Sequence, residues 1–132
     1  MARLLASRVF FLLLALGVSS GVTNADPTGY SRWNEYPPGF KAGFVMGVVA
    51  SLQMVFGEDQ HSLALANGIS DCAKDVGLSS DLLVEAVDRR YSENLDRWSE
   101  DAIVITFEVL RGVCLKYINE HRSKAHLPLW TR

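Results

Sequence analysis

The sequence is poor in the residues that build catalytic and metal sites. It has only two cysteines and three histidines, and it lacks a glycine-rich loop of the kind that cradles phosphates. His61, His121 and His126 stand in polar segments away from any glycine-framed serine, so no nucleophilic triad is expected. Cys72 and Cys114 could join His121 and His126 in a zinc site, but the spacing fits no usual zinc finger. We therefore expect neither an enzyme nor a metal or cofactor site.

The chain also lacks an excess of positive charge. Its 13 basic residues are outnumbered by 15 acidic ones, for a formal net charge of -2. Nucleic acids and anionic membranes bind basic surfaces, so we expect neither as a partner. Internal repeats and low-complexity tracts are absent as well, and the length of 132 residues suits one small domain.

The first 25 residues are typical of a cleaved secretory signal. Arg3 and Arg8 precede the apolar run VFFLLLALGV, which at ten residues is too short to span a bilayer as a helix. Cleavage is expected after Ala25, with Ser20 as the second choice, and a retained N-terminal anchor is the alternative. Removing residues 1–25 leaves 11 basic against 15 acidic residues, which is about four net negative charges. Membrane contact is then expected only during export.

Export changes the meaning of the two cysteines. In an oxidising compartment two cysteines usually pair, whereas in the cytosol the same two would more often be free or metal-bound. We therefore predict a disulfide between Cys72 and Cys114. Loop entropy assigns it about 4 kcal/mol of stability, which is a large share for a small domain.

Hydrophobic periodicity predicts an all-α fold: a small helical bundle of three main helices plus short turns, closed by one disulfide. Residues 26–39 hold three prolines and indicate an irregular N-terminal arm, residues 40–122 a disulfide-linked helical domain, and residues 123–132 a C-terminal tail. The helices are expected at about 40–57, 80–91 and 99–121, with one or two helical turns inside a loop at 58–78. Ser79 or Ser80 should cap the second helix and Ser99 the third. The disulfide would then close an antiparallel hairpin of the second and third helices.

Apolar spacing assigns a buried face to each predicted helix. On the first helix this face comprises Phe40, Phe44, Val45, Val48, Val49, Leu52, Val55 and Phe56. On the second it comprises Leu83, Ala86, Val87 and Tyr91, and on the third Ile103, Phe107, Leu110, Val113, Cys114 and Tyr117.

The first predicted helix carries an ambiguity about membranes. Residues 42–57 hold no charge, and Gly43 and Gly47 have the small-xxx-small spacing of membrane helix pairs. The stretch is shorter than the roughly 20 residues that a membrane span needs, and Ser51 and Gln53 interrupt it. We therefore expect Gly43, Gly47 and Ser51 to let another helix approach closely, either within the chain or across a homodimer.

One face of the second predicted helix resembles a carboxylate cluster, because Asp81, Glu85 and Asp88 recur along it. Arg89 and Arg90 lie beside these acids and supply counter-charges. This mixture favours a solvated face with an ion pair between Glu85 and Arg89 over a catalytic site.

The three tryptophans, Trp33, Trp98 and Trp130, all lie in predicted loops. Tryptophan is a favoured anchor at protein interfaces, so each is a candidate binding residue. The alternative is that the arm and the tail fold back and bury them on the core.

Two segments of the chain resemble a known family. FKAGFVMGVVASL and CAKDVGLSSDLLVEAVDRRYSENLDRWSEDAIVITFEVLRGVC, joined by a variable loop, resemble the Rap/Tai type of immunity protein, associated with type VI secretion in Gram-negative bacteria. The shared features are a glycine-containing helix that opens with an aromatic residue, a cysteine shortly before a tyrosine-ended helix, and an alanine-led helix with a second cysteine. The resemblance covers about residues 36–115. The chain differs at Ala73 and Lys74, where a proline commonly follows the first cysteine, and in continuing past Cys114.

Characterised members of that family are periplasmic helical proteins that bind and block a peptidoglycan-cleaving amidase toxin, which protects a cell from its own or its siblings' weapon. The resemblance therefore implies a periplasmic location and an amidase as protein partner. The resemblance implies that Cys72 and Cys114 form the family's disulfide. It also implies four framework positions, namely Phe44, Gly47, Tyr91 and Ala102. No inhibitory residue carries over.

A rigid loop with acidic and aromatic groups could occlude the thiolate and histidine of a cysteine amidase without chemistry of its own. Our hypothesis for that loop is segment 93–98, and its partner-binding residues would be Glu93, Asp96, Arg97 and Trp98. The alternative is an ordinary solvated turn. From another class of function, a periplasmic acid-stress chaperone is also helical with one disulfide, and it would expose its apolar face when its carboxylates are protonated.

Overall fold

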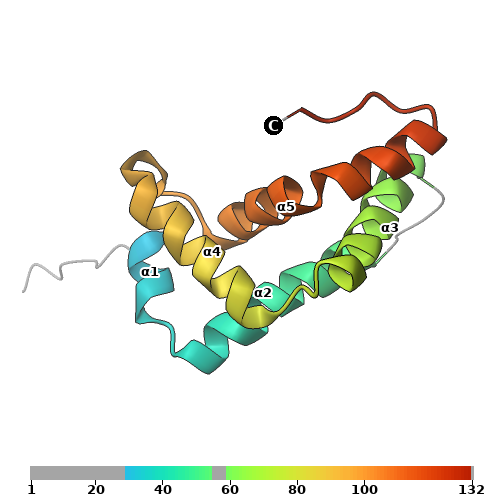
Figure 1. The fold of residues 1–132 in the computed structure, drawn as a ribbon. Coiled ribbons are helices and arrows are strands. Elements are labelled where there is room, and N and C mark those ends of the chain that lie inside the picture. The colour runs from blue at the N-terminus through green and yellow to red at the C-terminus, as the bar shows by residue number, and fades with distance from the viewer. Residues whose placement is uncertain (1–28, 55–58, 132) are drawn as a thin grey trace, which may run out of the picture.

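The computed structural model describes residues 29–54 and 59–131, and these ranges are helical without any strand. Along the chain lie α1 (Tyr30–Glu35), α2 (Pro38–Gln53), α3 (Gln60–Asp75), α4 (Ser80–Glu93), the short 3-10 helix η1 (Leu95–Arg97) and α5 (Ala102–Lys124) (Figure 1). The predicted all-α class is confirmed, but the described ranges contain five α-helices where three main ones were predicted. The predicted signal, both cleavage sites and the helix end at Gly57 lie outside the described residues.

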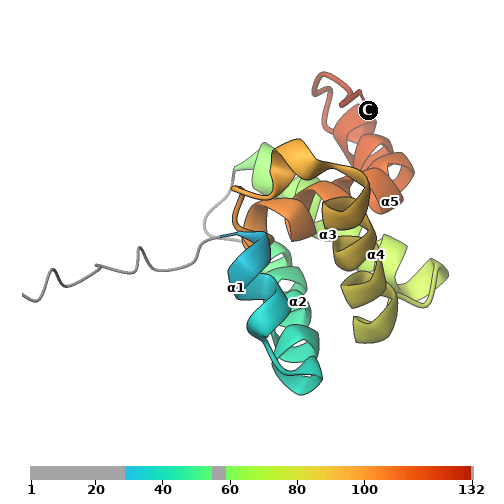
Figure 2. The same cartoon turned by 90° about the vertical axis from the view of Figure 1, so that its left-hand side faces the viewer.

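Helix α1 lies in the segment predicted to be an irregular arm, so that prediction is wrong for residues 30–35. A helix this short gains little from its own hydrogen bonds, and its stability comes from Trp33, which is completely buried. The Trp33 indole N–H donates to Asp88 Oδ1 over 2.6 Å, and its ring meets that of Phe44 edge-on. Pro38 forms the first turn of α2, where a missing N–H costs nothing, and Figure 2 shows α1 lying beside α2.

Helix α3 replaces the loop that was predicted for residues 58–78. The Asp59 carboxylate caps its start by accepting hydrogen bonds from the backbone N–H groups of His61 and Ser62. The Ser62 hydroxyl also donates to this carboxylate, and its hydrogen bond, followed by that of the Ser62 N–H, lowers the pKa of Asp59. Gly68 lies inside the helix, although glycine is disfavoured at interior helix positions. In the folded chain its lack of a side chain is what lets α3 reach α5, because a Cβ there would lie 2.6 Å from Ile118 Cα.

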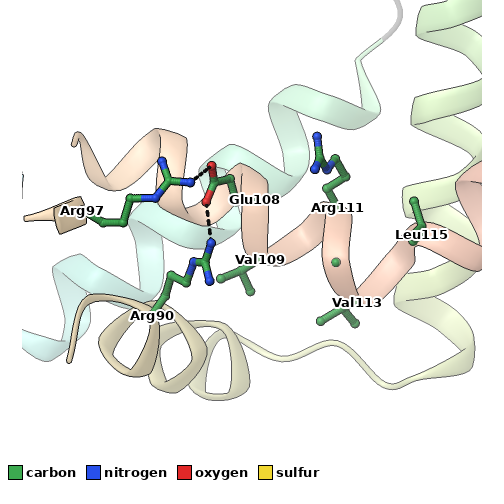
Figure 3. Close-up of a pocket in the computed structure, with 8 residues that line it drawn as sticks. Arg90, Arg97, Glu108, Val109, Arg111, Val113 and Leu115 are labelled. Carbon is green, nitrogen blue, oxygen red and sulfur yellow. Dashed lines mark hydrogen bonds and ion pairs between the residues drawn. The ribbon is translucent and has the colours of Figure 1, made fainter. Parts of the chain in front are cut away.

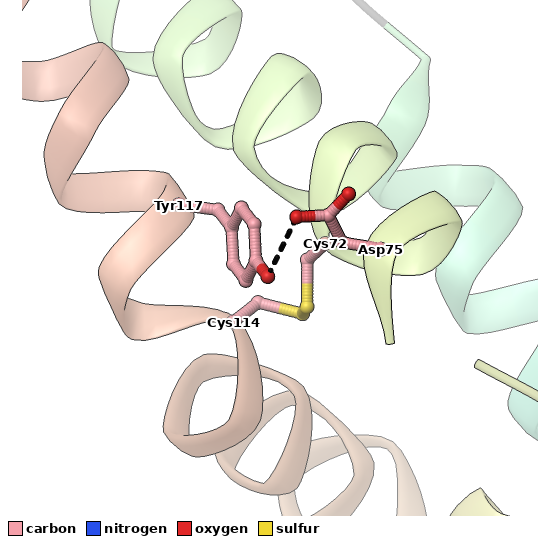
Figure 4. The surroundings of a disulfide bond; sticks show 4 residues. All are labelled: Cys72, Asp75, Cys114 and Tyr117. Carbon is pink, nitrogen blue, oxygen red and sulfur yellow. Dashed lines mark hydrogen bonds between the residues drawn. A yellow bond between two sulfur atoms is a disulfide. The ribbon is translucent and has the colours of Figure 1, made fainter. Parts of the chain in front are cut away.

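The predicted disulfide between Cys72 and Cys114 is present, with a Cα–Cα distance of 5.4 Å. It joins α3 to α5 and does not close a hairpin of the second and third predicted helices, because Cys72 belongs to α3. Beside it the Tyr117 hydroxyl of α5 donates to Asp75 Oδ2 of α3 over 3.0 Å (Figure 4). The same two helices are thus joined by close backbone contact, a covalent bond and a polar contact.

The core forms where α2, α3 and α4 pack on α5. Its α4 side consists of Leu83, Val87 and Tyr91, as predicted, while Ala86 is only half-buried. On α5 the buried face was predicted correctly only in part, because Leu110 and Cys114 are fully buried but Ile103 and Val113 are about half exposed. Ile105 and Ile118, which were not predicted, are also fully buried. Apolar residues occupy more than one face of α5, so periodicity alone could not choose the face that meets α2 and α4.

Both ends of α5 differ from the prediction. The helix is preceded by Asp101, not by a capping Ser99, and no side chain caps it. It continues to Lys124, past the expected end near residue 121, and the following tail turns back along the helix (Figure 1). Asn119 holds this tail by exchanging two hydrogen bonds with the Trp130 backbone, and the Arg122 guanidinium lies over the Trp130 ring.

The outer face of α2 has no covering helix among the described residues. A Cβ at Gly43 or Gly47 would meet nothing within 4 Å, so the predicted close approach of a helix does not occur within this part of the chain. Phe40, predicted to be buried, and Met54 are also exposed. Among the helices that the structure describes, none combines the length and apolar character that crossing a membrane requires.

Replacing Gly68 with alanine should destabilise the protein by about 2 kcal/mol, because the new methyl group would push α5 away at Ile118. The matched control is Gly43→Ala, which places a methyl in open space on α2 and should be neutral or stabilising by up to about 1 kcal/mol. Urea unfolding of both variants checks this difference. Equal stability of Gly68→Ala and the unchanged protein would contradict the close α3–α5 contact.

Removing the disulfide with the double variant Cys72→Ala and Cys114→Ala should cost about 4 kcal/mol, because the crosslink closes a long loop in the unfolded chain. The unfolding midpoint in urea, compared with that of the oxidised protein, measures the loss. A change below about 1 kcal/mol would show that loop closure contributes little here.

Candidate protein-binding surface

The segment between α4 and α5, residues 94–101, is called the connector below, and it includes η1. The four predicted site residues differ in how far they are exposed to solvent. Glu93 and Asp96 are exposed, Trp98 is 45% exposed, and Arg97 is half-buried and turned toward α5. Three of the four predicted residues are therefore open to solvent, while Arg97 contacts α5.

Trp98 is exposed but held in place from two sides. Its indole N–H donates to the Tyr91 carbonyl over 2.9 Å, at the end of α4. Its own carbonyl accepts from the Tyr30 N–H over 3.0 Å, and its ring stacks on that of Tyr30 with centroids 4.8 Å apart. The first turn of α1 is thus a support for the connector.

Gly29 makes this support possible. Its φ of 68° lies in the left-handed region that side chains disfavour, and a Cβ there would lie 2.2 Å from the Trp98 carbonyl oxygen. Only glycine lets the chain pass this close to the connector before α1 begins.

Arg97 ties the connector to α5. Its guanidinium pairs with Glu100. The same guanidinium donates to Glu108 Oε1 over 2.9 Å, and Arg90 of α4 donates to Glu108 Oε2 over 3.3 Å (Figure 3). The hydrogen bond with Glu100 and the charge of Glu108 raise the pKa of Arg97. Because Glu108 binds both arginines, it joins α4, the connector and α5 at one point.

Tyr91 of α4 anchors the connector through a hydrogen bond from its side chain. The side chain is fully buried, and its hydroxyl donates to the Glu100 carbonyl over 2.7 Å. Burial, and then the negative charges of Asp101 and Glu100, raise the pKa of Tyr91 to about 12. The connector is therefore fixed by contacts to α1, α4 and α5.

Sequence reasoning missed three residues that shape this surface, namely Tyr30, Arg90 and Glu108. Tyr30 was placed in an irregular arm, and its contact with Trp98 joins residues far apart in the chain. Arg90 was assigned to a solvated face, and Glu108 lies beside the predicted buried stripe. The charges of Arg90 and Glu108 are visible in the sequence, but which residues they pair with depends on how α4 crosses α5.

The other candidate sites have structural explanations. Both cysteine sulfurs are in the disulfide, so neither is available as a thiolate ligand for zinc. Within residues 29–54 and 59–131, no group of three or more histidine, cysteine or acidic residues is placed to hold a metal ion. In the carboxylate series on α4, Glu85 pairs with Arg89 over 2.6 Å as predicted, and Asp88 accepts from Trp33 and Lys41.

No protein-family model, curated protein or solved structure matches this chain. The resemblance to Rap/Tai immunity proteins therefore stays a prediction. The geometry offers a half-exposed tryptophan on a fixed connector, and this arrangement suits binding to a protein.

Stability should fall as the pH rises from about 10 toward 12, because unfolding lets Tyr91 ionise at the ordinary tyrosine pKa of about 10. The contribution is fully present below pH 10 and amounts to about 3 kcal/mol at most. In Tyr91→Phe this part of the pH dependence should disappear, although the variant loses a hydrogen bond at all pH values. Urea unfolding across this alkaline range gives the slopes, and identical slopes for both proteins would contradict the raised pKa.

Proposed function

We propose that this chain is an exported, periplasmic binding protein that inhibits a peptidoglycan-cleaving amidase toxin by occluding its active site. The observation that carries the proposal is the connector: Trp98 is 45% exposed, yet its backbone, its indole N–H and its ring all have partners. An anchor that is already ordered loses little conformational entropy on binding, so more of its contact energy appears as affinity.

The exposed side chains of the connector are suited to occluding an active site. A cysteine amidase works through a thiolate and a histidine in a cleft, and a blocker needs only to fill that cleft and exclude substrate. Leu95 and Trp98 are the exposed apolar side chains of the connector, at 68% and 45%, and the exposed carboxylates of Glu93 and Asp96 lie close by in sequence. The disulfide supports the export part of the proposal, because such bonds persist in oxidising compartments.

The oxidised protein, residues 26–132, should capture a single amidase-like hydrolase from the periplasmic and secreted proteins of its source, identified by mass spectrometry. With that partner in hand, Trp98→Ala should weaken binding roughly thirtyfold, the equivalent of about 2 kcal/mol. Because this change also removes the stack on Tyr30, Leu95→Asp is the second variant. It alters an exposed side chain and should weaken binding with little change in stability.

The matched control is Phe40→Ala, another exposed aromatic residue, located on α2 far along the chain from the connector. It should bind as tightly as the unchanged protein. If Trp98→Ala and Leu95→Asp both matched this control, the connector would be the wrong site. Capture of no hydrolase at neutral pH would count against inhibition altogether.

The uncovered face of α2 favours one second candidate, an acid-stress chaperone. Phe40 and Met46 of α2 are 52% and 39% exposed, and Met54, directly after the helix, is 60% exposed. Exposed apolar surfaces of this kind bind unfolded chains. The hydrogen bond from His121 lowers the pKa of Asp71, so this link between α3 and α5 is lost as acid protonates the carboxylate. Capture of many unrelated proteins only at acid pH would support this candidate against the inhibitor.

A further inference from the structure

Two open hollows adjoin each other along α5. The larger, of about 500 Å³, lies over Gly112 and is bordered by Arg90, Arg97 and Arg111 (Figure 3). The smaller, of about 290 Å³, lies between α4, α5 and the turn before α4. Val109 and Val113 line both hollows, and the two together are called the α4–α5 groove below.

The two ends of the α4–α5 groove differ in chemistry. One end is apolar and partly open to solvent, since Leu82, Val113 and Val76 are 55%, 48% and 44% exposed. The other end is basic. An occupant that satisfies both ends needs apolar side chains at one end and acceptors for guanidinium groups at the other.

The charges along the groove do not cancel. Four arginines line it against two glutamates, Glu85 and Glu108. Arg89 pairs with Glu85, and Glu108 is shared between Arg90 and Arg97, of which Arg97 also pairs with Glu100. Arg111 has no ion pair with any residue in the described part of the chain. This excess of positive charge lies on a chain whose formal net charge is -2, so the groove is a local basic site on an acidic protein.

We propose that the α4–α5 groove binds an acidic, amphipathic peptide segment of a partner protein, with apolar side chains over Val113 and Leu82 and carboxylates at Arg111 and Arg90. Arginine suits this role because its planar guanidinium can hold a carboxylate through two parallel hydrogen bonds. The apolar end adds burial of exposed valine and leucine surface. The inference rests on the groove alone and holds whether or not the partner is an amidase.

A peptide fits these observations better than a polyanion does. Nucleic acids and anionic membranes need a basic surface that extends over many phosphates, whereas Arg90, Arg97 and Arg111 border a single hollow on a chain of net negative charge. Neither polyanion accounts for the apolar half of the groove. A short segment with both kinds of side chain on one helical face accounts for both halves.

The test titrates the oxidised protein into a fluorescent, alanine-based helical peptide that has two leucines and two glutamates on one face, and follows the anisotropy. Two matched peptides replace the glutamates by lysine or the leucines by serine. The first peptide should bind about tenfold more tightly than either of the others, and its affinity should fall as salt is added. Phosphatidylglycerol vesicles are the probe for an anionic surface.

Two variants locate the binding site. Gly112→Leu fills the larger hollow without an internal clash, because a Cβ there meets nothing within 4 Å, and it should weaken binding about tenfold. Its control is Gly43→Leu, which changes an equally open helical glycine on α2 and should leave binding unchanged. Arg111→Gln should reduce the affinity for the glutamate peptide. The difference in affinity between the glutamate and lysine peptides should then be smaller than in the unchanged protein.

Equal binding of the glutamate and lysine peptides would overturn the inference. So would unchanged affinity in Gly112→Leu, or binding to the vesicles without binding to the peptide. Each of these results can occur while Trp98→Ala still abolishes capture of a hydrolase, so failure of the groove is distinguishable from failure of the proposed function.

Discussion

The close contact between α3 and α5 is the constraint on which the rest of the structure depends. Gly68 allows the Ile118 backbone to approach α3, and the disulfide keeps the two helices together nearby. Because α5 is the longest helix, its placement against α3 also sets where its first half meets α2 and α4. The groove, the core and the connector all depend on that placement.

The connector shows how a small helical protein can hold an exposed residue in place. A turn between two helices would ordinarily be mobile, since its backbone groups lack regular partners. Here three separate parts of the chain supply those partners: the start of α1 at Tyr30, the end of α4 at Tyr91, and Glu108 on α5. The conformational entropy of this segment is already lost when the chain folds, so it is not lost again when a partner binds.

The surface is divided by chemistry. Apolar side chains are exposed on the connector, on the outer face of α2 and at one end of the α4–α5 groove. The arginines at the other end of that groove contrast with the net acidity of the chain. Within the described residues the polar clusters consist of ion pairs and hydrogen bonds that stabilise the fold.

The sequence by itself determined the all-helical class, the Cys72–Cys114 pairing, the buried face of α4 and the Glu85–Arg89 pair. These features follow from local spacing, or from the fact that the chain has only two cysteines. Only the tertiary structure decided that residues 60–75 are helical, that Trp33 is buried and that Arg97 turns toward Glu108. Gly68 illustrates the reason: local propensity counts glycine against a helix, whereas its value here comes from a backbone that lies far away in the sequence.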